Sequence, residues 1–359
     1  MTKLLDKEDV RRQWDSQGML DCVEQFTEQC RKGEELARAF HLDPLKEIHH
    51  IVICGMGGSA IGGDLLKAYA AGECALPIEV VRNYTVPHSV GPRTLVITSS
   101  YSGETEETLS CYREAKKRGA AILAITTGGK LAVDCHKDGF PYLVIPKGYA
   151  PRAALGYSFM PLLVFFERWG LLPDQSRAIQ GLYRTLETCI ERYSFAVPTD
   201  SNKAKQLALT LQGNLPVIYA GQDGFQPVAA RWRAQINENS KSFAHDFVIP
   251  EMNHNEILGW NHPEDLVRAF HVVFLMDKGY HKQTQKRFKV MRKILEPVAS
   301  GISEETSEGQ GLLARLFSLI LLGDFVSVYL AFLYEQDPYP IPAIDMLKSA
   351  LNAPVPAIE

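Results

Sequence analysis

Two turns rich in glycine and serine carry the residues of this 359-residue sequence that are best suited to bind a ligand. The first turn reads GMGGSAIGG from Gly55 to Gly63 and lies between a short apolar run and a helical pattern. Glycine lets a backbone approach a ligand closely, and the free N–H groups of a helix N-terminus favour an anion. The turn therefore predicts an anion site; a tight turn that binds nothing is the alternative.

The same turn also fits the fingerprint of a dinucleotide-binding fold, as Gly55-x-Gly57-x-x-Ala60. That fingerprint requires an acid about 20 residues further on, at the end of the second strand, to hold the ribose. Glu79 has this spacing but lies inside the apolar run PIEVVRN, which continues to Asn83. The hypothesis of a nicotinamide-dependent dehydrogenase therefore depends on this one turn alone.

The second turn runs from Ser99 to Thr105, reads SSYSGET, and again joins a predicted strand to a predicted helix. It holds four serine or threonine hydroxyls, although one serine would be enough to cap the helix. Ser100, Ser102 and Thr105 can converge with the helix N–H groups around a phosphate. A phosphorylated ligand explains this turn, whereas a dinucleotide does not need it. Helix capping alone is the alternative.

The elements that position these turns are visible as a regular alternation. Strands are predicted at 49–55, 77–83, 93–100, 120–127 and 141–146, with helices at 61–72 and 104–119. Short apolar runs that alternate with helices indicate a parallel sheet covered on both faces. We therefore expect one α/β domain over roughly 45–170, preceded by amphipathic helices between Lys7 and Phe40.

A second alternation follows a helical stretch that continues to Tyr193. Strands are predicted at 215–221, 245–250 and 266–277, and helices at 226–241, 283–297 and 311–336, followed by a turn and a short last helix. The halves overlay in element order, since 51–66 matches 216–232 and 95–109 matches 271–288. We predict an α/β fold of two mostly parallel, doubly wound, flavodoxin-like sheets that arose by duplication.

The composition limits the class of protein. Lys plus Arg number 38 and Asp plus Glu 42, and this net charge of −4 argues against a general affinity for nucleic acid or acidic membranes. The seven cysteines form no Cys-x-x-Cys pair, so reduced thiols are expected. The charged N-terminal residues lack the apolar core of a signal peptide, and Arg315 and Asp324 interrupt the long apolar stretch at 312–334. We expect a soluble, cytoplasmic protein in which that stretch is a buried helix.

The two turns together resemble the sugar isomerase (SIS) domain, which binds phosphorylated sugars. Three further segments are similar to one branch of that family, the bifunctional phosphoglucose/phosphomannose isomerases: QINENSK at 235–241, PEMNHNEILGW at 250–260 and DPYPIPAIDMLK at 337–348. The resemblance covers the chain from about Ile51 to its C-terminus. It implies an isomerase that interconverts glucose 6-phosphate, and mannose 6-phosphate, with fructose 6-phosphate through a cis-enediolate.

The resemblance also implies roles for individual residues. Glu238 would be the base that moves the proton between C1 and C2, and Arg152, in APRAALGY, would stabilise the enediolate. His254, from the neighbouring subunit of a homodimer, and Lys348 would assist ring opening. Six residues of the two turns would hold the phosphate: Gly57, Gly58, Ser59, Ser100, Ser102 and Thr105. The family needs neither a metal nor a cofactor.

Two residues complicate this pattern. Tyr339 stands two residues after Asp337, where we expect a small hydroxyl side chain, so the balance of glucose and mannose activity stays open. Glu104 places a negative charge beside the second turn, where it would repel a phosphate unless its carboxylate points away. The alternative for each of the four catalytic candidates is a structural one: a solvated charge, a solvated loop or an ion pair.

The predicted organisation is N-terminal helices over 1–44, a first SIS subdomain with the phosphate turns over 45–190, and a second with the C-terminal helices over 195–359. The predicted protein is a homodimeric enzyme of glycolysis and gluconeogenesis that binds a hexose phosphate and neither nucleic acid nor membrane. The second hypothesis is a non-catalytic SIS protein that senses a phosphosugar and regulates a partner. Such a sensor would keep the serine turn without needing Glu238, His254 and Lys348 together.

Overall fold

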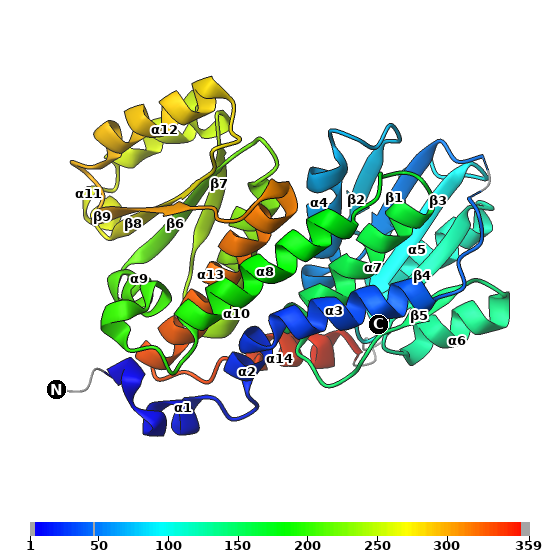
Figure 1. The fold of residues 1–359 in the computed structure, drawn as a ribbon, viewed down its shortest axis with the longest axis horizontal. Coiled ribbons are helices and arrows are strands. Elements are labelled where there is room, and N and C mark those ends of the chain that lie inside the picture. The colour runs from blue at the N-terminus through cyan, green and yellow to red at the C-terminus, as the bar shows by residue number, and fades with distance from the viewer. Residues whose placement is uncertain (1–3, 46, 353–359) are drawn as a thin grey trace, which may run out of the picture.

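The computed structural model describes residues 4–45 and 47–352 and contains two separate β-sheets (Figure 1). The first sheet has the strand order β2-β1-β3-β4-β5. Its strands are β1 (His50–Cys54), β2 (Ile78–Val81), β3 (Thr94–Ser100), β4 (Ala121–Thr126) and β5 (Tyr142–Val144). All its strand pairs are parallel. Every residue of the central strand β3 is buried, as expected when helices cover both faces of a parallel sheet.

The second sheet is also parallel throughout and has the order β7-β6-β8-β9. Its strands are β6 (Leu215–Gly221), β7 (His245–Ile249), β8 (Phe270–Met276) and β9 (Gly301–Thr306). This order repeats that of the first four strands of the first sheet, so β6 to β9 correspond to β1 to β4. The prediction of two doubly wound parallel sheets is confirmed, and the repeated order agrees with a duplication.

Helices follow the strands of the first sheet in sequence: α4 (Gly57–Ala70) after β1, α5 (Glu106–Lys117) after β3 and α6 (Gly129–Asp138) after β4. A short 3-10 helix, η2 (Pro151–Ala153), and α7 (Leu155–Arg168) come after β5. α7 packs against α4 on one side and α3 (Phe26–Ala39) on the other. The two helices α3 and α7 lie so close that a Cβ on Gly33 would come within 2.7 Å of the Gly156 carbonyl oxygen.

The N-terminal segment contains η1 (Leu4–Asp6), α1 (Glu8–Trp14) and α2 (Met19–Glu24) before α3, which confirms the helices predicted between Lys7 and Phe40. A buried lysine holds this segment to the second half of the chain. The Lys205 ammonium, fully buried, lies 3.0 Å from the Asp6 carboxylate and also donates to the carbonyl oxygens of Phe195 and Val197. Burial of a charged amine is costly unless it is paired and hydrogen-bonded in this way.

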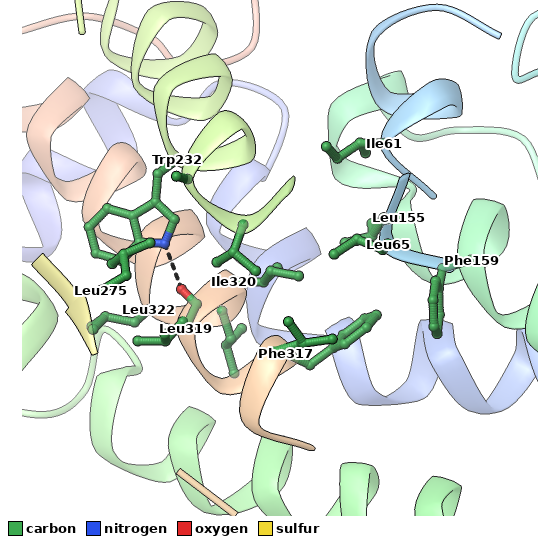
Figure 2. Close-up of a cluster of buried hydrophobic side chains, with 14 of the residues drawn as sticks. Ile61, Leu65, Leu155, Phe159, Trp232, Leu275, Phe317, Leu319, Ile320 and Leu322 are labelled. Carbon is green, nitrogen blue, oxygen red and sulfur yellow. Dashed lines mark hydrogen bonds between the residues drawn. The ribbon is translucent and has the colours of Figure 1, made fainter. Parts of the chain in front are cut away.

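The longest helix, α13 (Gly311–Leu333), packs against α8 (Ser176–Tyr193), α9 (Lys203–Leu211) and α10 (Gln226–Ser240). Figure 2 shows the contact with α10, where the Trp232 indole N–H donates to the Leu319 carbonyl at 2.8 Å. A Cβ on Gly323 would lie 2.5 Å from the Trp232 ring, so the close approach of α10 to α13 depends on glycine there. Among the described helices only α13 is long and apolar enough to cross a membrane, but its apolar window is completely buried, which confirms the predicted buried helix.

The remaining elements belong to the second half: η3 (Thr199–Ser201), η4 (Glu251–His254), η5 (Glu256–Asn261), α11 (Glu264–Val267), α12 (Lys282–Leu295) and α14 (Pro342–Asn352). The sequence prediction missed α6, α9 and β9. β9 reads GISEET and lies at the edge of its sheet, so it lacks the apolar run of a buried strand. The strand predicted at 266–277 was also too long, because residues 266 and 267 belong to α11.

The domain ranges 1–44, 45–190 and 195–359 stay predictions, and they include residues 1–3, 46 and 353–359, which lie outside the described part of the chain. All seven cysteines are free thiols, and five of them are buried.

The turns after β3 and β8 occupy corresponding places in the two halves but differ in chemistry. The turn after β3 is the serine-rich one. After β8, the buried carboxylate of Asp277 accepts hydrogen bonds from the Gly279 backbone N–H (2.6 Å), the Ser307 hydroxyl (2.5 Å) and Nε of Arg315 (2.8 Å). The second half therefore carries an internal anion where the first half carries hydroxyls.

Candidate active site

The glycine turn brings η2 against the start of α4. A Cβ on Gly58 would lie 2.4 Å from the Pro151 carbonyl oxygen and 3.1 Å from Cα of Arg152. Gly57 has φ +46°, a conformation that favours glycine. The N-cap residue, Met56, cannot cap the helix through its side chain, which leaves the first N–H groups of α4 available to a ligand. The turn thus places Arg152 next to a helix N-terminus.

The serine turn is held together by its own hydroxyls. Oγ of Ser100 lies 2.9 Å from Oγ1 of Thr105 and accepts a hydrogen bond from the Gly103 backbone N–H at 3.1 Å. The Ser102 hydroxyl accepts from the Glu104 N–H at 3.2 Å. Thr105 is the N-cap residue of α5, yet its side chain makes no capping hydrogen bond. Capping alone therefore does not explain the hydroxyls of this turn.

The two turns meet at the point where the strand order reverses. β1 and β3 are neighbours whose carboxyl ends lie side by side, and ligands of doubly wound sheets bind at such a switch point. The Ser59 hydroxyl, from the first turn, accepts a hydrogen bond from the Tyr101 N–H of the second at 3.1 Å. Gly57, Gly58, Ser59, Ser100, Ser102 and Thr105 therefore belong to two adjoining turns at one edge of the sheet.

Glu104 contacts a neighbouring helix. Its carboxylate accepts a hydrogen bond from the Lys130 backbone N–H, in the first turn of α6, at 2.7 Å. A carboxylate at that position complements the helix dipole of α6. This contact accounts for the negative charge beside the serine turn.

Arg152 and Glu238 lie together although 85 residues separate them in the sequence. The Arg152 side chain is 3% exposed, and its Nη1 lies 3.5 Å from Oε2 of Glu238, whose side chain is 28% exposed. Nε of Arg152 donates to Oδ1 of Asn239 at 2.7 Å, and Nη2 donates to the carbonyl oxygens of Pro338 and Tyr339. Burial lowers the pKa of Arg152 from its ordinary value, while Glu238 opposes that shift.

A cavity of about 880 Å³ lies between α4 and α10. Its lining includes Gly57, Gly58, Arg152 and Glu238, and two ion pairs, Arg82 with Asp64 and Arg233 with Asp246, stand further along it. The hydroxyl side chains of the two turns do not line this cavity. The cavity therefore joins the glycine turn to the Arg152–Glu238 pair.

His254 and Lys348 lie apart from this pair. His254 is exposed at the end of η4, Lys348 is exposed on α14, and neither lines the cavity. Tyr339 is half-buried, and it meets Arg152 through its backbone carbonyl. Within one chain, the structure unites four of the ten predicted site residues around the cavity: Gly57, Gly58, Arg152 and Glu238.

Lys241 was not among the predicted site residues. It follows α10 in a left-handed conformation, and its ammonium donates to the carbonyl oxygens of Glu238 (2.9 Å), Asp337 (2.8 Å) and Pro338 (2.9 Å). Burial, aided by the positive charge of Arg152, lowers the pKa of Lys241 to about 8. The signal that could have identified this lysine is its place in the same QINENSK segment as Glu238.

A second polar cluster holds the segment that carries His254. The Glu256 carboxylate accepts a hydrogen bond from the buried Tyr219 hydroxyl and lies 3.2 Å from Nε2 of His245, while Trp260 donates to the Tyr219 hydroxyl. The hydrogen bond with Glu256 raises the pKa of His245. Burial would raise the pKa of Glu256, but the hydrogen bonds from His245 and Tyr219 outweigh it and lower that pKa. No role was predicted for His245.

Among the described residues, no group of three or more His, Cys, Asp or Glu side chains is arranged to hold a metal ion. The groups that the structure places at or beside the cavity are the Glu238 carboxylate, the Arg152 guanidinium, the Lys241 ammonium and the first backbone N–H groups of α4.

Two family models match the chain. The SIS domain matches residues 45–138, and the bacterial phospho-glucose isomerase C-terminal SIS domain matches residues 200–351. Among solved structures, a glucose-6-phosphate isomerase like protein from Thermus thermophilus is similar with a TM-score of 0.63, 17% identity, and coverage of 95% of this chain and 99% of that one. Glucosamine-6-phosphate deaminase from Thermotoga maritima has a TM-score of 0.65 at 17% identity, over 90% of this chain and 97% of that one. These two likenesses show the fold.

The sequence relatives are much closer. A bifunctional phosphoglucose/phosphomannose isomerase of Caldicellulosiruptor bescii is 45% identical over 334 residues, which are 93% of this chain and 98% of the relative. Another, from Aquifex aeolicus, is 37% identical over 84% of this chain and 90% of that protein. With identity of this extent, the chain belongs to the family of bifunctional phosphoglucose/phosphomannose isomerases.

Proposed function

We propose that the protein interconverts glucose 6-phosphate, and mannose 6-phosphate, with fructose 6-phosphate. The observation that carries this proposal is the buried Arg152 guanidinium facing the Glu238 carboxylate on the cavity that begins at the glycine turn. Aldose–ketose isomerisation requires a base to move one proton between C1 and C2, and a positive group near the oxyanion that develops. Membership of the family supports the same reaction.

Glu238 would take the proton from one carbon and return it to the other. Arg152 would stabilise the cis-enediolate, since a buried cation acts in an environment where its charge is poorly screened. Return of the proton to either face of the planar C2 gives glucose or mannose 6-phosphate, which accounts for two activities at one site.

The phosphate would bind at the two turns, on the N–H groups of α4 and α5. Gly57, Gly58, Ser59, Ser100, Ser102 and Thr105 are the proposed contacts. Thr105 leaves the N-terminus of α5 without a side-chain cap, which supports this placement. A phosphate held by N–H groups and hydroxyls needs no basic surface, in keeping with the net charge of −4.

Ring opening would be assisted by His254 and Lys348, with His254 supplied by the partner in a homodimer. Both side chains are exposed in the single chain. α14, which carries Lys348, also exposes Met346, Leu347 and Leu351 at 58–74% of their surface, and a subunit interface would cover such apolar side chains. The proposed enzyme serves hexose phosphate metabolism in the cytoplasm.

The decisive test is fructose 6-phosphate isomerisation, coupled to reduction of NADP by glucose-6-phosphate dehydrogenase, in the wild type and in Glu238→Gln. We expect Glu238→Gln to lose at least about 10³-fold in kcat while still binding the sugar phosphate, because a positioned base contributes about 10² to 10⁴. Glu296→Gln, which changes an exposed carboxylate directly after α12, is the matched control and should keep full activity. A wild type that binds fructose 6-phosphate without isomerising it would instead identify a phosphosugar sensor.

A further inference from the structure

The carboxylate of Asp324 lies in the middle of α13, among apolar residues, and is 4% exposed. Burying a carboxylate is costly unless it is paired, and apolar side chains of similar size often replace a buried ion pair without loss of stability. Core packing alone therefore does not explain an aspartate at this position. Its contacts lead directly to the active site.

Asp324 is bound by Arg231 of α10. Nε and Nη2 of Arg231 donate to the two carboxylate oxygens of Asp324 at 3.1 and 2.7 Å, and Gln235 donates to Oδ1 at 3.0 Å. Nη2 of Arg231 also donates to the backbone carbonyl of Arg152 at 3.0 Å. Because the guanidinium is planar and paired on two edges, it fixes the position of the Arg152 backbone.

A second path reaches the Arg152 side chain from the same turn of α13. Oδ1 of Asn239 accepts from Nε of Arg152, and Nδ2 of Asn239 donates to the Ser327 hydroxyl at 2.9 Å. The Ser327 hydroxyl donates to the Asp324 carbonyl at 2.7 Å. Asp324 and Ser327 thus support Arg152 at two points, one on its backbone and one on its guanidinium.

We propose that Asp324, acting through Arg231, is a positioning residue that holds Arg152 where the enediolate develops. This inference rests on the proposed isomerase function. A guanidinium that stabilises charge only in the transition state must be held closely in place, and a displacement of about 1 Å can lower kcat about 10²-fold. Arg231 also lines the cavity, but its hydrogen bonds go to the Asp324 carboxylate and to the Arg152 carbonyl.

The same helix offers a matched control. Arg315 of α13 forms another ion pair, with the buried carboxylate of Asp277 in the turn after β8; Nε of Arg315 lies 2.8 Å from Oδ2 of Asp277. Arg315 lies nine residues before Asp324 in the sequence, which is about 13 Å along a helix. The contacts of Asp277 are with Gly279, Ser307 and Arg315, away from Arg152.

The test compares two double variants. The first combines Arg231→Met and Asp324→Leu and removes the proposed positioning pair. The control combines Arg315→Met and Asp277→Asn. The first double variant should stay folded, because apolar side chains can replace a buried ion pair; its melting temperature also reports the loss of the hydrogen bonds that Gln235 and the Arg152 carbonyl make with the pair. We expect it to lose about 10²-fold in kcat with KM changed by less than about threefold. It should also bind 5-phospho-D-arabinonate, whose carboxylate mimics the enediolate, about 10- to 100-fold more weakly while still binding sorbitol 6-phosphate. The control pair should keep wild-type kcat.

A folded first variant with wild-type kcat would overturn the positioning role. If the melting temperature of that double variant is lower than that of the wild type, the single variant Arg231→Lys tests the positioning role instead. Lysine keeps the charge beside Asp324 but cannot bind both the carboxylate and the Arg152 carbonyl as a fork does, so kcat should fall at least about 10-fold. Wild-type kcat in Arg231→Lys would also overturn the role. A wild-type protein without isomerase activity refutes the proposed function, whereas an active wild type with fully active variants refutes only this inference.

Discussion

Lys241 and Arg152 donate hydrogen bonds to the same acceptor, the carbonyl oxygen of Pro338, at 2.9 and 2.5 Å. Two cations therefore meet at one turn, beside the proposed base Glu238. Arg152 contributes to the low pKa of Lys241, about 8, although burial is the larger cause. The charge on this corner of the site consequently changes within the range of pH in which the enzyme can be assayed.

The first prediction concerns that titration. As the pH rises above about 8, Lys241 loses its proton and its contacts with the 337–338 carbonyls weaken. We expect kcat to fall on the alkaline side with an apparent pKa of about 8, and Lys241→Arg to remove that limb because arginine stays charged. Steady-state kinetics between about pH 6 and 10 measure this. Lys278→Arg, on an exposed turn, is the control, and an unchanged limb in Lys241→Arg would contradict the prediction.

The second prediction tests which chain supplies His254. His254→Ala and Glu238→Gln should each be nearly inactive alone. In a mixed dimer, one of the two sites contains an intact Glu238 from one chain and an intact His254 from the other. Random exchange of subunits should therefore restore roughly a quarter of wild-type activity. Heterodimers that form, as detected with two different affinity tags, but stay inactive would show that His254 acts within its own chain.

The third prediction concerns the phosphate. Ser100→Ala removes a buried hydroxyl that connects Thr105 to the Gly103 N–H. Since a hydrogen bond to a charged group contributes about 1.5 to 3 kcal/mol, KM for fructose 6-phosphate should rise about 10- to 100-fold, with a smaller effect on kcat. Ser110→Ala, on α5 but outside the turn, should keep the wild-type KM. Equal kinetics for both variants would place the phosphate elsewhere.

The fourth prediction concerns stability. The raised pKa of His245 means that its ion pair with Glu256 is fully present below about pH 6.5 and is lost as the pH rises through the higher folded pKa. The lowered pKa of Glu256 means that its contribution is present above about pH 4.5 and is lost as the pH falls through the lower folded pKa.

His245→Gln should therefore lower the melting temperature more at about pH 5.5 than at about pH 9. Differential scanning calorimetry of wild type and variant measures the two differences. His136→Gln, exposed on α6, should show no such dependence. A difference for His245→Gln that is the same at both pH values would contradict the ion pair.

The fold could be predicted because each central strand is a short apolar run between helices. IVIC and LVIT lie in β1 and β3, where burial on both faces favours short apolar runs, although Thr98 at the end of LVIT is buried as well. β9 was missed because half of an edge strand faces solvent, and GISEET carries two glutamates. α6 was missed because half of its ten residues are charged or polar and because it begins at Gly129, directly after Gly128.

The site could be predicted only as separate segments. Glu238 and Arg152 were identified by their motifs, but their contact depends on how α10 packs against η2, which local sequence does not determine. The acceptors on Pro338 and Tyr339 are backbone carbonyls, which every residue has, so no residue type marks them. Asp324 was visible in the sequence as an interruption of an apolar stretch. Its proposed role could be inferred only from the structure, which shows its ion pair with Arg231.

The internal carboxylate of Asp277 has a consequence for stoichiometry. The duplicated fold offers two corresponding turns, one after β3 and one after β8. In the second, Asp277 already takes the hydrogen bonds that a bound anion would need, from Gly279, Ser307 and Arg315. In the second half of the chain, the Asp277 side chain therefore fills the place that a bound anion would take. We expect titration calorimetry to count one sugar phosphate per chain, with no second, weaker binding phase.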